Sequence, residues 1–472
     1  MNLQRRQFVQ AAAAAIATAQ FPILGANDRI QVGVVGVGAR GTDHLGTYAS
    51  LDSDCRIAAV CDVDQAARES AVSKVYKAKG YSPQDYNDLR KMFESKDIDA
   101  VSIATPNHWH ALATIWACDA GKDVYVEKPA SHNIFEGQQM VAAARKHNRM
   151  VQVGSQYRSE PYKMHAVRLL REGVIGHVYG ARAVVFRRRF SIGHTPDEPV
   201  PHGRDWDIFL GPAQWKPYSK NKFVYNWNWV WDTGNGDIAN QGSHEMDLAL
   251  WGLGRSGWPV SVSSSGGKFV WEDDQQTPNT QQATVDFGDA QVTVDVRNLP
   301  TPPEGLIAGA PIRLEEGASS AWPFSMYDQR GPNCVEDIFF GDLGFLILNR
   351  TGIQVYRSSA GNLSGDAALG ADAGSREKYE KTVDEKPQAA EDFAPHVRNF
   401  FDAIRARDYK LLNADVEIGV RSAAFCHLAN ISYRVGRTLR ISPSTGRCLG
   451  DEDANALLTR NYRDPYIVPT IG

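Results

Sequence analysis

Two side chains that can carry protons stand in separate segments of this chain. Lys128 lies in Val126–Pro129, directly after a short apolar run, and His244 lies in Gly242–Asp247, near the start of an expected helix. An imidazole titrates near neutral pH, and a lysine beside a positive charge has a lowered pKa, so both could exchange a proton with a hydroxyl. Taken singly, each also fits a structural role, as a surface lysine after a strand and as a buried histidine.

A glycine-rich turn lies far upstream of both residues. Ile30–Val35 is a short apolar run that predicts a buried strand, and Gly36-x-Gly38-x-x-Gly41, with Arg40 before the last glycine, turns the chain into a helix. The first glycine permits the tight turn, the second lets the backbone approach a pyrophosphate, and the third lets the helix lie close to the strand. The segment therefore predicts a dinucleotide site.

An acidic residue stands where such a site needs one. The second expected strand, 56–60, leads to Asp62, which lies 21 residues beyond Gly41. A carboxylate at this offset accepts hydrogen bonds from the adenosine ribose, and a free 2′-hydroxyl suits it better than a 2′-phosphate. We therefore expect NAD as the cofactor and consider NADP less favoured.

Two further strand ends should border this cofactor, because ligands of open α/β sheets bind at the carboxyl ends of strands. One carries Thr105, Asn107 and His108 within the segment 104–110, and the other carries Glu127 beside Lys128. We expect all five side chains to line the cofactor site. Asn107 could instead, or in addition, cap the helix that follows.

The histidine segment has polar and aromatic neighbours that suit a carbohydrate. If a helix begins near Asn240, then Asn240, His244, Asp247 and Trp251 share one face, the imidazole points into a cleft, and Asp247 is a further candidate for substrate contact. Just upstream, the segment 225–231 alternates aromatic and polar residues. Its rings, Trp227 and Trp229 among them, could stack on the C–H face of a sugar, or could instead form the core-facing side of a strand.

The elements that must position these residues form two units. Strands and helices alternate over residues 27–150, which predicts a doubly wound parallel sheet of the Rossmann type. Residues 151–445 contain longer strand-like runs, at 178–187, 260–271, 281–287 and 291–297, with helices at 159–172 and 243–253. We expect an α+β domain with a large, mostly antiparallel open sheet, so the overall fold class is α/β.

Three C-terminal segments complete the organisation. Residues 358–387 show no apolar period and predict a surface excursion or a loose linker, whereas Phe393, Val397, Phe400, Phe401 and Ile404 share one face of a helix that returns to the core. Residues 446–472 are expected to form a tail.

Composition excludes some classes of function. The chain has 472 residues and a net charge of −4, so it has no broad basic surface for nucleic acid. Its six cysteines show no CxxC pair and no metal-ligand spacing. We therefore expect buried thiols and neither a metal site nor a nucleic-acid partner.

The N-terminus resembles a twin-arginine export signal. Arg5 and Arg6 precede an alanine-rich apolar stretch, 11–19, that is too short to span a bilayer. We assign residues 1–26 to this signal and expect a periplasmic or secreted protein. No later apolar run reaches spanning length, so no membrane span is expected in the mature chain.

Taken together, the motifs resemble the glucose-fructose oxidoreductase and inositol dehydrogenase (Gfo/Idh/MocA) family. The resemblance rests on the glycine turn, on Glu127-Lys-Pro129 and on Gly242-x-His244-x-x-Asp247 in this order. It implies that Lys128 is the acid/base or hydroxyl-polarising residue and that His244 is the proton acceptor. It also implies a small carbohydrate substrate and a homo-oligomer.

The same resemblance implies further residues in the substrate cleft, and the chain departs from the family's pattern at one position. Gln156, Tyr157 and Arg158 begin the second domain and should face the cleft, and His202, Arg204 and Asp205 are further candidates for substrate contact. Family dehydrogenases commonly carry an aspartate four residues before the histidine, where this chain has Asn240. An amide can hold the imidazole by a hydrogen bond, but it supplies no negative charge to an imidazolium.

Three functions are consistent with these features. Because no dependable pool of NAD exists outside the cytoplasm, we expect a tightly held cofactor that is restored within each cycle. A sugar, cyclitol or glycoside oxidoreductase is preferred. The alternative is an NAD-retaining glycosidase or lyase that works by oxidation, elimination and reduction. The leader and Thr105-Pro-x-His-Trp-His110 resemble the NAD-dependent α-N-acetylgalactosaminidases, although Glu127-Lys-Pro129 replaces their usual Glu-Val-Pro. The third function is a secreted, non-catalytic sugar-binding protein.

Overall fold

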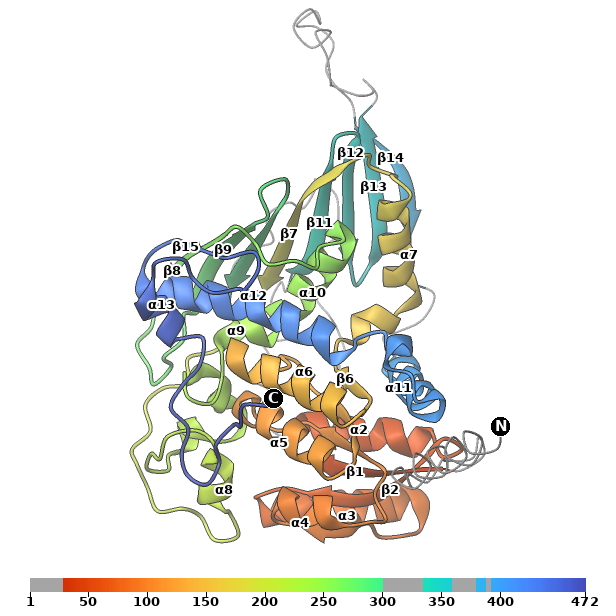
Figure 1. The fold of residues 1–472 in the computed structure, drawn as a ribbon, viewed down its shortest axis with the longest axis vertical. Coiled ribbons are helices and arrows are strands. Elements are labelled where there is room, and N and C mark those ends of the chain that lie inside the picture. The colour runs from red at the N-terminus through yellow and green to blue at the C-terminus, as the bar shows by residue number, and fades with distance from the viewer. Residues whose placement is uncertain (1–28, 300–333, 359–378, 388–391) are drawn as a thin grey trace, which may run out of the picture.

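The computed structural model describes residues 29–299, 334–358, 379–387 and 392–472. The proposed export signal and part of the predicted excursion at 358–387 therefore lie outside the described residues. Figure 1 shows two units, one around each sheet, with α6 and α12 between them.

The first unit is a parallel sheet in the strand order β3-β2-β1-β4-β5-β6. This is the order of a doubly wound dinucleotide-binding fold, in which the order reverses beside β1. Its strands and helices are β1 (Ile30–Val35), α2 (Ala39–Ser50), β2 (Cys55–Cys61), α3 (Gln65–Lys79), β3 (Gln84–Tyr86), α4 (Leu89–Glu94), β4 (Ala100–Ile103), α5 (Asn107–Asp119), β5 (Asp123–Val126), α6 (Ile134–Lys146) and β6 (Val151–Val153). The predicted Rossmann unit is confirmed.

The second unit is a nine-stranded sheet in the order β14-β13-β12-β11-β7-β10-β9-β8-β15. All its pairs are antiparallel except β10 with β7, so the predicted, mostly antiparallel open sheet is confirmed. Its strands are β7 (Val178–Phe186), β8 (Ser261–Gly267), β9 (Thr280–Asp286), β10 (Gln291–Arg297), β11 (Cys334–Gly341), β12 (Gly344–Asn349), β13 (Gly352–Ser358), β14 (Tyr379–Glu385) and β15 (Leu439–Arg440).

Helices cover one face of this second sheet (Figure 1). They are α7 (Pro161–Arg171), α10 (Gly242–Leu253) and α12 (Val416–Val435), and their apolar residues form one core with those of the strands. Short helices complete the chain: η1 (Gln156–Ser159), α8 (Trp206–Leu210), η2 (Lys220–Lys222), η3 (Val224–Trp229), α9 (Gly236–Asn240), η5 (Tyr409–Leu411) and α13 (Glu452–Ala456).

The region after β13 differs from the sequence expectation. The Lys- and Glu-rich end of the predicted excursion forms the edge strand β14, which gains backbone hydrogen bonds from β13 although its side chains are mostly exposed. An exposed edge strand needs little apolar periodicity, so composition gave no sign of it.

The predicted apolar helix forms as α11 (Ala394–Ala406), but it packs against the first sheet. Phe401 lies 6.1 Å from Tyr48 between ring centroids, and Phe400 lies 6.0 Å from Tyr125. The C-terminal residues also return to this unit, where Tyr466 meets the indole of Trp109 at 5.5 Å. Residues 446–472, expected as a C-terminal tail, therefore include a segment that docks on the first unit.

Two other expectations can be compared with the described residues. No described helix is both long enough and apolar enough to cross a membrane. The cysteines are free thiols, all buried except the half-buried Cys334, and burial raises the pKa of Cys448 to about 11.

Candidate active site

The glycine turn has the geometry that a pyrophosphate cradle requires. Gly36 adopts φ +79°, and a Cβ there would lie 2.7 Å from the carbonyl oxygen of Ala104. A Cβ on Gly41 would lie 1.8 Å from the Gly36 oxygen, whereas one on Gly38 would meet no atom within 4 Å. Helix α2 has no side-chain cap and no acidic residue in its first turn. Its first amides can therefore bind an anion, so the turn fits a dinucleotide.

Asp62 lies beside this turn, as predicted. Its Oδ2 accepts from the Val37 N–H at 2.8 Å and its Oδ1 accepts from the Asp64 N–H at 3.0 Å. Burial raises the pKa of Asp62. The two backbone bonds fix the carboxylate, and each oxygen keeps accepting capacity for a ribose hydroxyl.

Glu127 forms a buried polar centre with Arg40. Its Oε1 accepts from Arg40 Nε at 3.0 Å and from Gln156 Nε2 at 3.1 Å, and it lies 2.9 Å from His44 Nε2. Burial alone would raise the pKa of Glu127, but Arg40 and His44 hold it well below its usual range. Glu127 therefore supports α2 and the turn through Arg40.

Gln156, predicted to contact substrate, belongs to the same buried network. Its Nε2 also donates to the Tyr125 hydroxyl at 2.8 Å. Because Gln156 is buried with this amide nitrogen bound on two sides, it joins β5 to η1 and does not line an open cleft.

The residues after β4 have two roles: some can bind a cofactor, and others hold neighbouring segments together. Thr105 Oγ1 is buried and has no hydrogen-bond partner among the described residues, so it remains available to a cofactor. Asn107 donates to Asn235 Oδ1 at 3.2 Å and does not cap α5, whose N-cap position is Pro106.

His108 is also part of the framework. It is fully buried, with one ring nitrogen 2.9 Å from the Phe209 carbonyl oxygen and the other 3.3 Å from that of Thr233. Burial lowers the pKa of His108 to about 3. The predicted cofactor contacts of Asn107 and His108 are thus replaced by contacts that tie α5 to the 209–235 segment.

Lys128 and Asn240 meet directly. Lys128 Nζ donates to the Asn240 carbonyl oxygen at 2.8 Å and to its Oδ1 at 3.2 Å. The Asn240 amide nitrogen donates to the Tyr225 hydroxyl at 2.9 Å and to Asp237 Oδ1 at 3.2 Å. The expected contact between Asn240 and the imidazole is therefore not formed. The physical reason is that α9 ends at Asn240 and α10 begins at Gly242, so the two residues do not lie on one continuous helix.

His244 lies close to Lys128 and keeps an unused nitrogen. Its ring centroid is 4.8 Å from that of Tyr157, and its Nδ1 is buried with no partner among the described residues. Burial, with the Lys128 charge, holds the pKa of His244 well below its usual range. The free protein therefore presents a neutral imidazole that can accept a proton.

The structure adds Asp237, which sequence reasoning did not single out. This buried carboxylate accepts from Arg189 Nε at 3.0 Å and Nη2 at 2.7 Å, and from Asn298 Nδ2. Burial opposes ionisation, but Arg189 lowers the pKa of Asp237 below its usual value. An acidic residue three positions before Asn240 was the available signal, and its arginine partner lies too far away in sequence to be inferred.

Arg158 and Asp247, both predicted to contact substrate, bind each other. Arg158 Nε and Nη2 donate to the two Asp247 oxygens at 2.7 and 2.9 Å, and the Ser422 hydroxyl donates to Oδ1 at 2.6 Å. Both residues are buried. Opposite charges this far from solvent satisfy each other, so the pair anchors η1 to α10 and α12.

The aromatic segment is not a strand. Residues 224–229 form the 3-10 helix η3, which buries Trp229 and packs the half-buried Trp227 against the cluster around Trp206 and Phe223. The buried Trp229 indole therefore offers no open face on which a sugar could stack, and the Trp227 indole is half-buried. Tyr225, which bonds to Asn240, is the ring of this segment that reaches the site.

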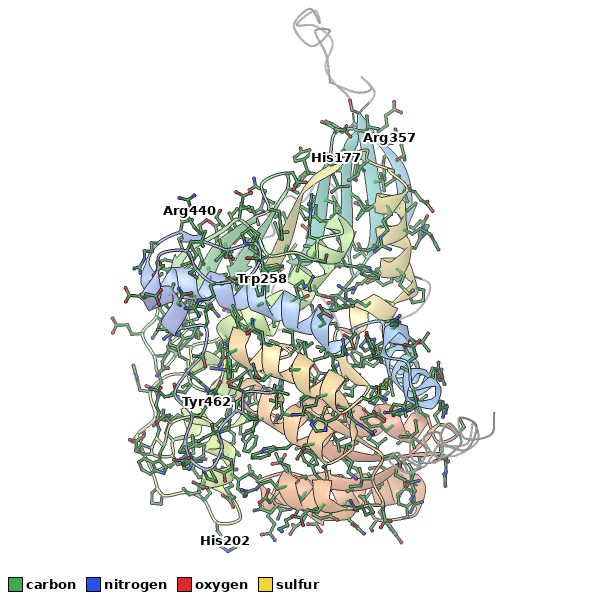
Figure 2. All side chains as sticks on the ribbon, in the orientation of Figure 1. His177, His202, Trp258, Arg357, Arg440 and Tyr462 are labelled. Carbon is green, nitrogen blue, oxygen red and sulfur yellow. The ribbon has the colours of Figure 1, made fainter. Side chains whose placement is uncertain are left out.

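The further candidates lie at the edge of the first sheet. Arg204 Nε donates to Asp64 Oδ2 at 2.8 Å, and Asp205 Oδ2 accepts from Asn87 Nδ2 at 3.1 Å. His202 is exposed at the outer limit of this segment (Figure 2). None of the three reaches Lys128 or His244 by a hydrogen bond among the described residues.

Comparison with known proteins agrees with this architecture. Residues 30–155 match "Oxidoreductase family, NAD-binding Rossmann fold", and residues 185–280 and 377–468 match "Oxidoreductase family, C-terminal alpha/beta domain". Inositol 2-dehydrogenase of Salmonella typhimurium is 29% identical over 173 residues, which are 36% of this chain and 49% of that protein. α-N-Acetylgalactosaminidase of Shewanella oneidensis is 31% identical over 170 residues, 34% of this chain and 36% of that protein. The chain thus spans about half or less of the length of these relatives.

Solved structures share the whole fold at low identity. The WlbA dehydrogenase of Bordetella pertussis, in complex with NADH and UDP-GlcNAcA, superposes with a TM-score of 0.58 at 19% identity, over 88% of this chain and 99% of that one. Levoglucosan dehydrogenase with NADH and levoglucosan gives 0.61 at 17% identity, over 87% and 99%. The two family matches together cover more than half of the sequence, and the chain belongs to the Gfo/Idh/MocA family of NAD-binding oxidoreductases.

Proposed function

We propose that this protein oxidises a hydroxyl of a sugar, cyclitol or glycoside with an NAD that it retains between turnovers, and that a second carbonyl compound takes the hydride back from the bound NADH. The observation that carries the proposal is the pairing of the Lys128 ammonium, fixed by two contacts to Asn240, with a neutral His244. Both lie where the carboxyl end of β5 meets the first turns of α10.

The bound cofactor would be held by the glycine turn, by Asp62 at the ribose and by Thr105. NAD supplies the acceptor and donor of hydride when bound. Lys128 donates a hydrogen bond to the substrate hydroxyl oxygen, and His244 accepts the proton that this hydroxyl loses. Asn240 positions Lys128, and Tyr157 supports the imidazole face.

A segment of the second unit supports retention of the cofactor. Residues 203–205 of this segment contact the first unit at residues 63–65, just after Asp62. The Gln65 N–H donates to the Gly203 oxygen at 2.9 Å, and the Asp205 N–H donates to the Val63 oxygen at 3.0 Å. The Arg204–Asp64 ion pair adds a third link. Gln65, Arg68, Asn87 and residues 203–205 line a cavity of about 420 Å³. The ends of β2 and β3 form the adenosine side of such a fold, so we expect this cover to slow nucleotide release.

The second candidate is net hydrolysis or elimination of a glycoside, which the similarity to the Shewanella α-N-acetylgalactosaminidase favours. Oxidation of a sugar hydroxyl makes the adjacent C–H acidic. Once His244 has released the hydroxyl proton to solvent, it can take the C–H proton and return it to the oxygen of the departing aglycone. Water addition and return of the hydride then give a redox-neutral reaction. The same residues serve both candidates, so the substrate decides between them.

Location and assembly complete the proposal. Arg5 and Arg6 support export to the periplasm or beyond by the twin-arginine route. The stacked rings of Phe345 and Tyr356, 4.8 Å apart, and the exposed Tyr379 support self-association through the β12–β14 region of the second sheet.

The test is single-turnover reduction of bound NAD by a panel of sugars and cyclitols, with aryl glycosides assayed for aglycone release. Lys128→Ala should slow the responding reaction by about 10²–10⁴-fold while NAD stays bound. Lys77→Ala, at an exposed position of α3 outside the site, is the control for the loss of a lysine. Unchanged turnover in Lys128→Ala would refute the mechanism, and NAD binding without any response across the panel would favour a non-catalytic sugar-binding protein.

A further inference from the structure

A second cavity, of about 520 Å³, lies apart from the proposed chemistry. It is enclosed by the end of α10, the start of α12, the η5 turn and the last turn of α7, and neither Lys128, Asn240 nor His244 lines it. Its volume falls within the range of small-molecule sites, roughly 300–1,000 Å³. Nothing in the proposed reaction uses this space.

Positive side chains dominate its wall. Six cations line the cavity against two carboxylates: Arg145, Arg158, Arg171, Arg255, Lys410 and Arg421 face Asp415 and Glu417. A concave surface with one excess sign of charge concentrates counter-ions.

Ion pairs account for four of the six cations. Arg145 binds Asp415, Arg421 binds Glu417 at 3.1 Å, Arg158 binds Asp247 at 2.7 Å, and Arg255 binds Asp289 at 2.8 Å. The exposed side chains of Arg171 and Lys410 have no carboxylate partner among the described residues. The cavity therefore carries two cations that no described acid neutralises.

The paired guanidiniums add fixed donors to this excess charge. Arg145 lies 3.9 Å from the Tyr409 ring centroid, and Arg158 lies 5.0 Å from that of Trp251. These contacts with the rings fix the orientation of both guanidinium planes. The Asp247 carboxylate binds Arg158 through Nε and Nη2 only, and Arg255 Nε is buried with no partner among the described residues. Each guanidinium has five N–H groups, so donors remain for a ligand.

We propose that this cavity binds a small organic anion that carries two phosphate or sulfate ester groups. Tetrahedral oxyanions match guanidinium donors, and two such groups supply at least the two negative charges that balance Arg171 and Lys410. The rings of Trp251 and Tyr409 provide apolar contact for the body of the molecule. Binding there requires neither nucleotide nor turnover, so it stands or falls separately from the proposed function.

The experiment is titration calorimetry on the full-length protein saturated with NAD, so that the glycine turn is filled. The probes are inorganic pyrophosphate and a disulfated disaccharide, with the unsulfated disaccharide as the neutral control. We expect one site per chain for at least one charged probe, with affinity that falls as salt rises. Preference for the disulfated disaccharide supports sulfate ester groups, preference for pyrophosphate supports phosphate groups, and equal binding identifies the shared oxyanion chemistry.

Two double variants make the test specific. Arg171→Gln with Lys410→Gln removes the unneutralised charges without breaking an ion pair, and it should weaken binding by about tenfold or more. Lys77→Gln with Arg440→Gln makes the same change in net charge at two exposed positions outside the cavity and should leave binding unchanged. Equal weakening in both variants, or no charged probe binding above the neutral disaccharide, would overturn the proposal.

Discussion

The two halves of the candidate site differ in what their polar groups contact. In the cofactor half, the first amides of α2 and the Thr105 hydroxyl have no side-chain partner among the described residues. In the substrate half, Arg158 and Arg189 form buried ion pairs with Asp247 and Asp237, whereas Nδ1 of His244 is buried with no hydrogen-bond partner among the described residues. Charged residues near a cleft can therefore be framework, whereas unsatisfied donors and acceptors mark the places where a ligand binds.

The largest expected effect tests the framework role of Asp247. Asp247→Ala leaves the buried Arg158 guanidinium without its carboxylate, and we expect the free energy of unfolding to fall by about 3–5 kcal/mol. Urea denaturation measures this change. Glu94→Ala, which removes the exposed pair with Lys91, should change it by less than about 1 kcal/mol. Normal stability of Asp247→Ala combined with a raised KM would instead assign Asp247 to substrate binding.

The next effect separates fold from ligand binding within the glycine turn. Gly41→Ala forces a Cβ to within 1.8 Å of the Gly36 oxygen and should destabilise the protein by about 3 kcal/mol. Gly38→Ala meets no atom within 4 Å and should keep the melting temperature of the nucleotide-free protein, yet lose bound NAD because the methyl group occupies the open side. Equal loss of stability in the two variants would contradict this division. Thermal unfolding and the NAD content of the purified variants are the readouts.

The smallest effect concerns the buried histidines that hold the framework. Burial lowers the pKa of His427 to about 4, so on unfolding below its ordinary pKa near 6.5 it takes up a proton. Stability should therefore fall as pH drops from about 6.5 to about 4, by up to about 1.4 kcal/mol per pH unit for this residue. His427→Gln, which can still donate to the Ser131 oxygen, should flatten that slope by one proton. An unchanged slope would show that His427 does not titrate in this way.

The elements that short stretches of sequence specify were predicted well. The β1–Gly36–α2 unit, Asp62 and the apolar face of α11 are each fixed by residues close together in sequence, and the structure places them as these patterns predict. The partners of Arg158 and His108 were not predictable, since Asp247 and Phe209 lie 89 and 101 residues away. The interruption of the helix between α9 and α10 was likewise not predictable. It places Asn240 against Lys128 and not against His244.

We infer that the glycine turn and Asp62 hold an NAD that stays with the protein. This can be tested by purifying the native protein without added nucleotide, denaturing it, and identifying and quantifying any released dinucleotide by mass spectrometry and absorbance. We expect NAD or NADH at close to one per chain. Release of NADP at that level would contradict the role of Asp62, and the absence of any dinucleotide would contradict the retained cofactor.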